Sequence, residues 1–231
     1  MERRAIIDCR EKKRHGASQN KYAKNAATTE RDEKVYHVML RGIDGKPLFL
    51  KDGDYRKFLF LLNKRLTEFK ASLYGFVLMT NHVHLQIKSN NIKSLVNELS
   101  SGYTGFYVNT YKVYTALFEA PKIVEKISDE FQAENLWYIL NNPVKEGLSK
   151  TPGGYKYSSY MFYTKRKTKI SDLINVDCSF IKYYYKSINE LNADLREDLR
   201  GSKSKKKFRK SYGLKYNGWN KWSGDSNKKQ V

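Results

Sequence analysis

Apolar and polar residues alternate over short stretches in the first half of the chain, a pattern typical of half-buried β-strands. Val35–Arg41 is rich in strand-forming residues, and in His82–Ile87 the apolar positions alternate with two histidines and a glutamine. The compact apolar run Leu73–Leu78 indicates a central strand. Asn81 suits a bend, so the last two strands are predicted to form a hairpin.

Longer segments lie between and after these strands, and their apolar residues recur at the spacing of an amphipathic helix. The first such segment is Tyr55–Lys70, with Asp54 as a suitable capping residue. The second is Ile92–Tyr114, although Gly102 and Gly105 are weak helix formers. We predict a helix over each segment.

A fourth strand and a third helix are predicted further along the chain. Lys122–Ile127 is β-like, and Ser128–Glu130 places acids at the start of a helix that runs from about Glu130 to Leu140 or a little beyond. Pro143 is expected to end or kink that helix. The order β-α-β-β-α-β predicts an α+β, ferredoxin-like sandwich. Its antiparallel sheet has the histidine strand in the middle, and a further helix follows.

The ends of the chain differ from this folded region. Residues 1–32 are polar and are predicted to form a flexible basic leader, whereas 33–165 form the folded domain. Tyr155–Tyr163 is expected to return over that domain. Residues 166–231 are predicted to be a helical and then basic C-terminal extension, with two short helices in Ile170–Leu199.

Composition indicates a folded protein with a polyanionic partner. The chain has 231 residues, 40% of them hydrophobic, and a formal net charge of +20. Such an excess favours nucleic acid as the partner over a membrane surface, because no basic amphipathic anchor stands out. No apolar run approaches the roughly 18 residues of a membrane-spanning helix. Two distant cysteines indicate a reducing compartment. We therefore expect a cytoplasmic, nucleoid-associated protein.

The last 31 residues combine positive charge with aromatic side chains. Ten Lys or Arg residues accompany a single acidic residue, Asp225, and two Tyr and two Trp are interleaved. That mixture suits single-stranded nucleic acid, because every base offers a face to stack on; a solvated tail is the alternative. The predicted DNA-binding residues are Arg41, Lys205, Lys206, Lys207, Arg209 and Lys210.

Two histidines provide the first candidate chemistry. His82 and His84 are two residues apart on a strand, so their side chains project from one face. Two neutral imidazoles in that arrangement can chelate one divalent metal ion. A solvated strand face with two hydrogen-bonded histidines explains the same spacing.

The third predicted helix carries a second candidate group. Tyr138 and Asn142 are four residues apart and therefore share a helix face. A tyrosine hydroxyl can attack phosphorus, but its ordinary pKa near 10 makes it a weak nucleophile without a nearby cation. An amide oxygen one turn away is a suitable ligand for a hard cation. The alternative is a packing tyrosine.

Four stretches together resemble a known family: Tyr36–Gly42, Val77–Leu85, Tyr138–Leu148 and Tyr157–Tyr160. Their order and spacing are similar to those of the single-tyrosine transposases of the HUH endonuclease superfamily, in particular the REP-associated branch. The resemblance covers about residues 33–163. It implies a transposase that cuts single-stranded DNA at hairpin-marked ends through a 5′-phosphotyrosine intermediate.

The resemblance also implies roles for individual residues. His82 and His84 match the family's metal ligands, Tyr138 matches its nucleophile, and Asn142 matches the residue that completes the metal site. The implied cofactor is Mg²⁺ or Mn²⁺, with no nucleotide cofactor. The implied assembly is a homodimer, in which the tyrosine helix of one chain can serve the histidines of the other.

The sequence departs from the family at two places. Trp137 stands where the family usually has arginine, and Ala116–Lys122 is less basic than the family's corresponding stretch. These departures leave open a domesticated relative that binds DNA hairpins without cutting them. A rolling-circle or conjugative nickase ranks last, because Tyr138 stands alone on its helix.

Overall fold

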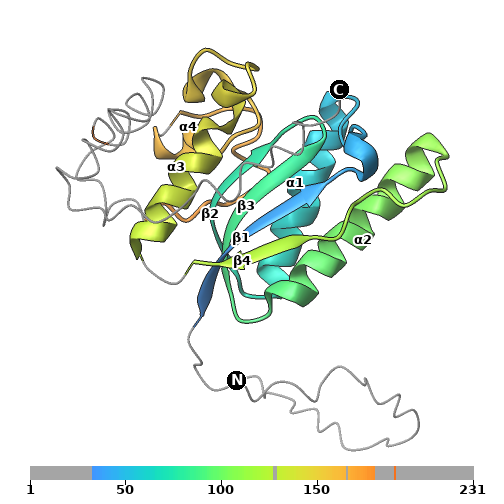
Figure 1. The fold of residues 1–231 in the computed structure, drawn as a ribbon, viewed down its shortest axis with the longest axis horizontal. Helices are drawn as coiled ribbons and strands as arrows, with labels where there is room; N and C mark the ends of the chain where they lie inside the picture. The colour runs from blue at the N-terminus through green and yellow to red at the C-terminus, as the bar shows by residue number, and fades with distance from the viewer. Residues whose placement is uncertain (1–32, 127–128, 165, 180–189, 191–231) are drawn as a thin grey trace, which may run out of the picture. The chain divides into compact units, whose positions relative to one another are not determined.

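The computed structural model describes residues 33–126, 129–164, 166–179 and 190 (Figure 1). Its elements, in chain order, are β1 (Lys34–Arg41), η2 (Ile43–Gly45), α1 (Asp52–Glu68), β2 (Ser72–Leu78), β3 (His82–Ser89), α2 (Ile92–Tyr111), β4 (Lys122–Glu125), α3 (Asp129–Lys145), η3 (Pro152–Gly154) and α4 (Tyr160–Tyr163). The predicted α+β class is confirmed. The leader 1–32 and the basic segment 201–231 lie outside the described residues.

The four strands form one antiparallel sheet in the order β2-β3-β1-β4. The histidine strand β3 is interior, as the sequence predicts, and it forms the predicted hairpin with β2. The ferredoxin-like assignment stays a prediction. Opposite β3, the register of β1 pairs Met39 with His84 and Arg41 with His82.

The prediction that β2 is a central strand is wrong, because β2 lies at the edge of the sheet. The returning segment covers that edge: Leu78 N donates to Tyr157 O, and Ser159 N donates to Phe76 O, each at 2.9 Å. Burial on both faces and along the edge explains why β2 is apolar throughout. The predicted return of the chain over the domain is confirmed at this edge.

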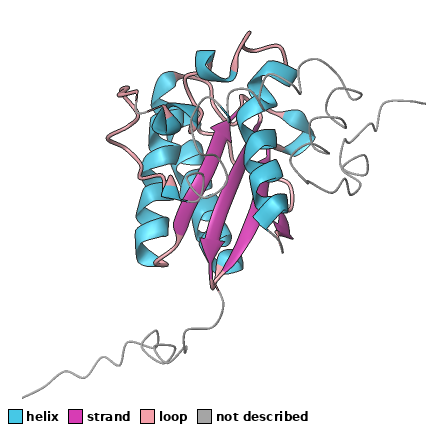
Figure 2. Cartoon of the chain, turned by 90° about the vertical axis from the view of Figure 1, so that its left-hand side faces the viewer, coloured by secondary structure: helices cyan, strands magenta, loops and turns pink. Residues whose placement is uncertain are grey.

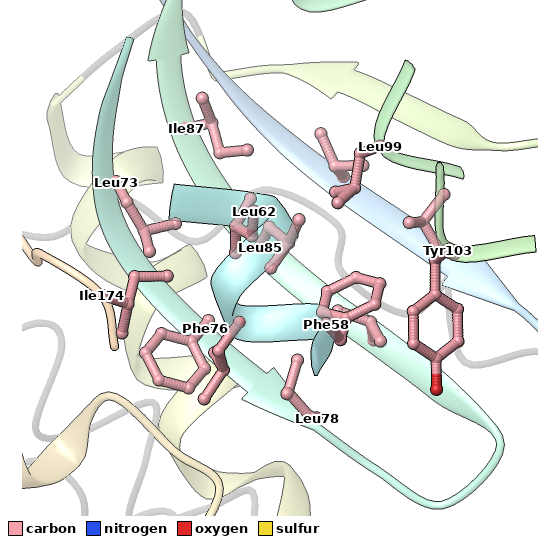
Figure 3. Close-up of a cluster of buried hydrophobic side chains, with 14 of the residues drawn as sticks. Phe58, Leu62, Leu73, Phe76, Leu78, Leu85, Ile87, Leu99, Tyr103 and Ile174 are labelled. Carbon is pink, nitrogen blue, oxygen red and sulfur yellow. The ribbon is translucent and has the colours of Figure 1, made fainter. Parts of the chain in front are cut away.

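Helices cover both faces of the sheet (Figure 2). α1 and α2 lie on the face that receives Val83, Leu85 and Ile87, and together these elements form the main apolar core. Figure 3 shows side chains from α1, α2, β2 and β3 meeting in this core. α3 lies on the opposite face, against β2 and β3.

Helix boundaries differ slightly from the predicted ones. α1 begins at Asp52, three residues early, and Asp54 is inside its first turn, where its carboxylate accepts the backbone N–H groups of Leu50 and Lys51. α2 ends at Tyr111, because Lys112 adopts a left-handed conformation with φ 57°. It continues through both of its glycines, since packing outweighs their weak propensity.

α3 ends at Lys145, two residues beyond Pro143, close to the predicted end at Leu140 or a little beyond. Gly147 adopts φ +70°, Gly147 N donates to Val144 O, and Leu148 N donates to Pro143 O. This is the Schellman arrangement, which satisfies the last carbonyl groups of the helix. The glycine therefore terminates α3, one turn beyond Leu140.

The C-terminal extension begins without the predicted helices. Residues 170–178 form turns and irregular chain, and the rest of the two predicted helices lies outside the described residues apart from 179 and 190. Ile170 and Ile174 are buried in the main core, and Asp177 N donates to Leu73 O at 2.8 Å. Packing against β2 therefore fixes this segment in an irregular form.

Candidate active site

Three histidines project from the sheet toward α3. His84 on β3 is buried, and its Nδ1 lies 2.9 Å from Nε2 of His37 on the neighbouring strand β1. The ring centroids of His82 and His84 are 5.0 Å apart. No pattern in the sequence pointed to His37; sheet register brings it beside His84.

The hydrogen bonds of His82 determine which of its nitrogens can bind a ligand. His82 Nδ1 lies 2.8 Å from Asn81 Oδ1. Asn81 Nδ2 donates to Gly45 O at 3.2 Å, which fixes the orientation of the amide. Because Oδ1 can only accept, Nδ1 of His82 carries the proton and Nε2 keeps its lone pair.

α3 brings the predicted tyrosine and asparagine to these rings. The ring centroid of Tyr138 is 5.4 Å from that of His84 and 5.9 Å from that of His37. The Asn142 side chain hydrogen-bonds to both Tyr138 and His82. One chain therefore brings His82, His84, Tyr138 and Asn142 together.

Burial keeps the histidines neutral. It lowers the pKa of His37 to about 3, with the charge of Lys126 acting in the same direction. Burial also holds the pKa of His84 well below its usual range. For His82, burial lowers the pKa while Glu146 and Asn142 oppose the shift. Neutral imidazole is the form that binds metal ions.

The Tyr138 hydroxyl stays protonated near neutral pH. Burial raises its pKa, the carboxylate of Glu146 adds to that shift, and the hydrogen bond to Asn142 opposes it. The exposed Lys145 holds its Nζ 4.6 Å from the centre of the Tyr138 ring and 5.0 Å from that of Trp137. A nucleophilic role for this phenol therefore requires positive charge at the reacting phosphate.

A buried polar pair fixes α3 against the strand that carries the histidines. Gln86 projects from the same face of β3 as His84. Asn135 Nδ2 donates to Gln86 Oε1 at 3.1 Å, and Gln86 Nε2 donates to Gln132 O at 3.0 Å. Val77, Met79 and Ile139 form an apolar cluster beside Tyr138. These contacts set the position of α3 relative to the imidazoles.

The predicted DNA-binding residues fall in two places. Arg41 lies at the end of β1 opposite His82 in register, and its Nε is 3.7 Å from Glu119 Oε1. The five others, Lys205, Lys206, Lys207, Arg209 and Lys210, lie outside the described residues. Arg41 is thus the one placed next to the histidines.

The donor set determines which metal ions the site could accept. Over the described residues there is no group of three or more His, Cys, Asp or Glu arranged to hold a metal ion. Two neutral imidazoles and an amide are a smaller set, which leaves positions for water or phosphate oxygens. Such a set suits a divalent cation that accepts imidazole ligands, and the Mn²⁺ or Mg²⁺ implied by the family resemblance stays a prediction.

Comparison with known proteins identifies a shared fold. No protein-family profile and no curated protein matches the sequence. Among solved structures, a REP-associated tyrosine transposase bound to a REP hairpin is similar, with a TM-score of 0.51 and 13% identity. The match covers 61% of this chain and 86% of that one. At this identity the likeness establishes the fold alone.

In the described part of the chain, no helix combines the length and apolar character needed to cross a bilayer.

Proposed function

We propose that this protein is a metal-dependent transposase that cuts single-stranded DNA beside hairpins and transfers the cut strand. The observation that carries the proposal is the meeting of Tyr138 with His84, while Asn142 hydrogen-bonds to both Tyr138 and His82. A phenol beside two neutral imidazoles and an amide is an arrangement suited to phosphoryl transfer.

Each group has a distinct role in the proposed reaction. His82, His84 and Asn142 would hold Mg²⁺ or Mn²⁺, which when bound supplies positive charge at the scissile phosphate. The Tyr138 oxygen forms a bond to phosphorus and loses its proton, while the 3′ oxygen leaves and gains one. The product is a 5′-phosphotyrosine and a free 3′-OH. A second 3′-OH reverses the step at a new site, so no nucleotide cofactor is required.

We propose that Lys145 assists that reaction. Its ammonium group is exposed and lies against the Tyr138 ring. A cation there attracts the phosphate to the hydroxyl and stabilises the negative charge that develops on the phosphoryl oxygens.

The proposed substrate is single-stranded DNA with hairpin ends. The structural neighbour was solved with a REP hairpin, and the net charge of +20 favours a polyanion. A homodimer, expected from the family resemblance, stays a prediction. All four proposed site residues come from one chain, so a partner's tyrosine helix is not needed to complete the set.

A hairpin-binding protein without cleavage activity is the second candidate. The raised pKa of Tyr138 favours it, as does Trp137 at the position where the resembling family has arginine. A protein with that function would bind DNA hairpins with an affinity that depends strongly on salt, and it would form no covalent adduct with them.

A covalent-adduct assay separates the two candidates. We would incubate the protein with a labelled pool of single-stranded hairpins carrying randomised flanks, in Mn²⁺ or in EDTA, and resolve it under denaturing conditions. We expect a protein–DNA adduct in Mn²⁺, none in EDTA and none with Tyr138→Phe. Tyr114→Phe is the matched control, because Tyr114 is 79% exposed.

Adduct formation by Tyr138→Phe would overturn the assignment of the nucleophile. Hairpin binding by the wild-type protein without any adduct would favour the binding protein instead.

A further inference from the structure

We infer that His37 is a positioning residue, whose hydrogen bond to His84 Nδ1 orients that ring with Nε2 toward the site beside Tyr138. The effect of this hydrogen bond on metal binding rests on the proposed function. Its effect on the orientation of the His84 ring does not.

The contact between the two rings is specific. His37 Nε2 and His84 Nδ1 are 2.9 Å apart, and the ring centroids are 5.1 Å apart with planes inclined by 31°. The residues lie on paired strands, with His37 opposite Gln86 and Met39 opposite His84. The backbone ladder therefore holds the two side chains in diagonal contact.

The position of His84 makes the choice of nitrogen consequential. His84 is only 3% exposed, so its ring cannot turn freely to present either nitrogen to a ligand. An imidazole whose Nδ1–H donates to a fixed acceptor keeps its lone pair on Nε2, the tautomer that binds a metal ion through Nε2.

The neighbouring ligand candidate is held in the same way. His82 also has Nδ1 in a hydrogen bond to an adjacent side chain, that of Asn81, at 2.8 Å. The strand thus carries two imidazoles on one face, both tied through Nδ1, which leaves Nε2 of each for the site. His37 therefore has the same relation to His84 as Asn81 has to His82: each hydrogen-bonds to Nδ1 of the ring.

His37 itself is not a candidate ligand in this arrangement. Its Nε2 is occupied by the bond to His84. It acts through His84, as residues that surround a metal site commonly do.

The first test reads the tautomer directly and needs neither metal nor DNA. The full chain has only four histidines, His15, His37, His82 and His84, so long-range ¹⁵N–¹H spectra of histidine-labelled protein are tractable. We expect His84 in the wild-type protein to carry its proton on Nδ1. A His84 that carries its proton on Nε2 would overturn the inference, whatever the protein's activity.

The second test compares two substitutions. His37→Phe keeps a ring but removes the acceptor, whereas His37→Gln places an amide oxygen near the position of Nε2. We expect Mn²⁺ affinity, measured by the loss of the free Mn²⁺ EPR signal, to fall about 10- to 100-fold in His37→Phe. We expect His37→Gln to retain it to within about threefold.

The outcomes distinguish this inference from the proposed function. If the wild-type protein binds Mn²⁺ and His82→Ala abolishes binding, then equal affinity in His37→Phe overturns only the role of His37. An equal fall in affinity in His37→Phe and His37→Gln also overturns it, because packing alone would explain it. If the wild-type protein binds no Mn²⁺, the proposed function fails, and the tautomer spectrum alone decides the orienting role of His37.

Discussion

At the scale of single residues, the site is defined by groups that burial holds in their neutral forms. Three imidazoles have lowered pKa values and one phenol has a raised pKa. Neutral imidazoles suit a cation, whereas a protonated phenol needs one nearby to become a nucleophile. The lowered pKa values of the imidazoles and the raised pKa of the phenol therefore both suit a site that a divalent ion and a phosphate enter together.

These lowered pKa values predict reduced stability in mild acid. The pKa of His37 falls from 6.5 to about 3 on folding, so between those values the unfolded chain binds more protons than the folded one. Stability is therefore retained above about pH 6.5 and decreases as the pH falls toward 3. Each such histidine contributes up to about 1.4 kcal/mol per pH unit. Urea unfolding between pH 7.5 and 5.0 measures this, and we expect a shallower pH dependence for His37→Gln. Equal dependences would contradict the prediction.

The ammonium group of Lys145 leads to a prediction about the rate of adduct formation. Lys145→Met removes the cation beside Tyr138, and we expect the rate of adduct formation to fall about tenfold or more, which corresponds to about 1.4 kcal/mol. Lys145→Arg should retain most of the rate because it keeps the charge. Loss of the ammonium contacts with the Tyr138 and Trp137 rings should lower the stability of Lys145→Met by about 1 kcal/mol, and melting curves check that both variants stay folded. A Met variant as fast as the wild-type protein would exclude a role for the ammonium.

Sequence periodicity pointed to four residues of the candidate site but not to His37. His82 and His84 follow the two-residue period of a strand, and Tyr138 and Asn142 follow one helical turn, so local spacing reveals each pair. His37 has no such partner nearby in the sequence, because its partner lies 47 residues away. Only the register between β1 and β3 brings them together.

At the scale of elements, the placement of α3 depends on a close approach to β2. A Cβ atom added at Gly75 would lie 2.3 Å from Leu136 Cδ1, and Leu136 is buried. A shift in the pairing register of β2 and β3 between Leu73 and Gly75 accompanies this contact. The absence of a side chain at Gly75 therefore allows α3 to pack where Tyr138 meets the imidazoles.

Gly75→Ala is accordingly expected to lower the free energy of unfolding by about 1–3 kcal/mol, the usual cost of overpacking, and to slow adduct formation. Gly105→Ala is the matched control. Gly105 is an exposed residue of α2 with open space around its Cβ position, so alanine there should stabilise the protein by up to about 1 kcal/mol. Denaturant unfolding tests both variants. If Gly75→Ala proved as stable as the wild-type protein, the close approach would not limit the packing.

The spacing of hydrophobic residues predicted the type and order of these elements, since it identified each strand and the three main helices. It predicted less well what each element packs against. The apolar run Leu73–Leu78 predicts a central strand, but β2 is an edge strand. A returning segment covers that edge, and an edge strand that is covered in this way is as apolar as an interior one. α3 ends two residues beyond Pro143, close to the prediction, and the left-handed Gly147 terminates it. The error on β2 concerns tertiary surroundings that a local pattern does not contain.

At the scale of the whole molecule, the two faces of the sheet differ in what they carry. One face contributes to the apolar core with α1 and α2, and the other carries the histidines under α3. The excess of 44 Lys and Arg over 24 Asp and Glu predicts that DNA binding weakens steeply between about 50 and 200 mM salt.

Replacing Lys205, Lys206 and Lys207 by Gln tests whether the C-terminal basic segment contributes to that binding. We expect the slope of log K against log salt to decrease by about 0.7 for each phosphate of single-stranded DNA that the variant no longer neutralises. Lys64→Gln is a control, because Lys64 pairs with Glu68 on the surface of α1. An unchanged slope in the triple variant would remove this segment from the DNA-binding surface.

The most direct measurement is the location of the covalent bond to DNA. Wild-type protein would be incubated with the hairpin pool and Mn²⁺, digested with nuclease and protease, and mapped by mass spectrometry. We predict a 5′-linked nucleotide on Tyr138, absent when Mn²⁺ is omitted. A nucleotide attached to any other residue, or attached to Tyr138 equally well after His82 and His84 are both replaced by alanine, would contradict the proposed transposase mechanism.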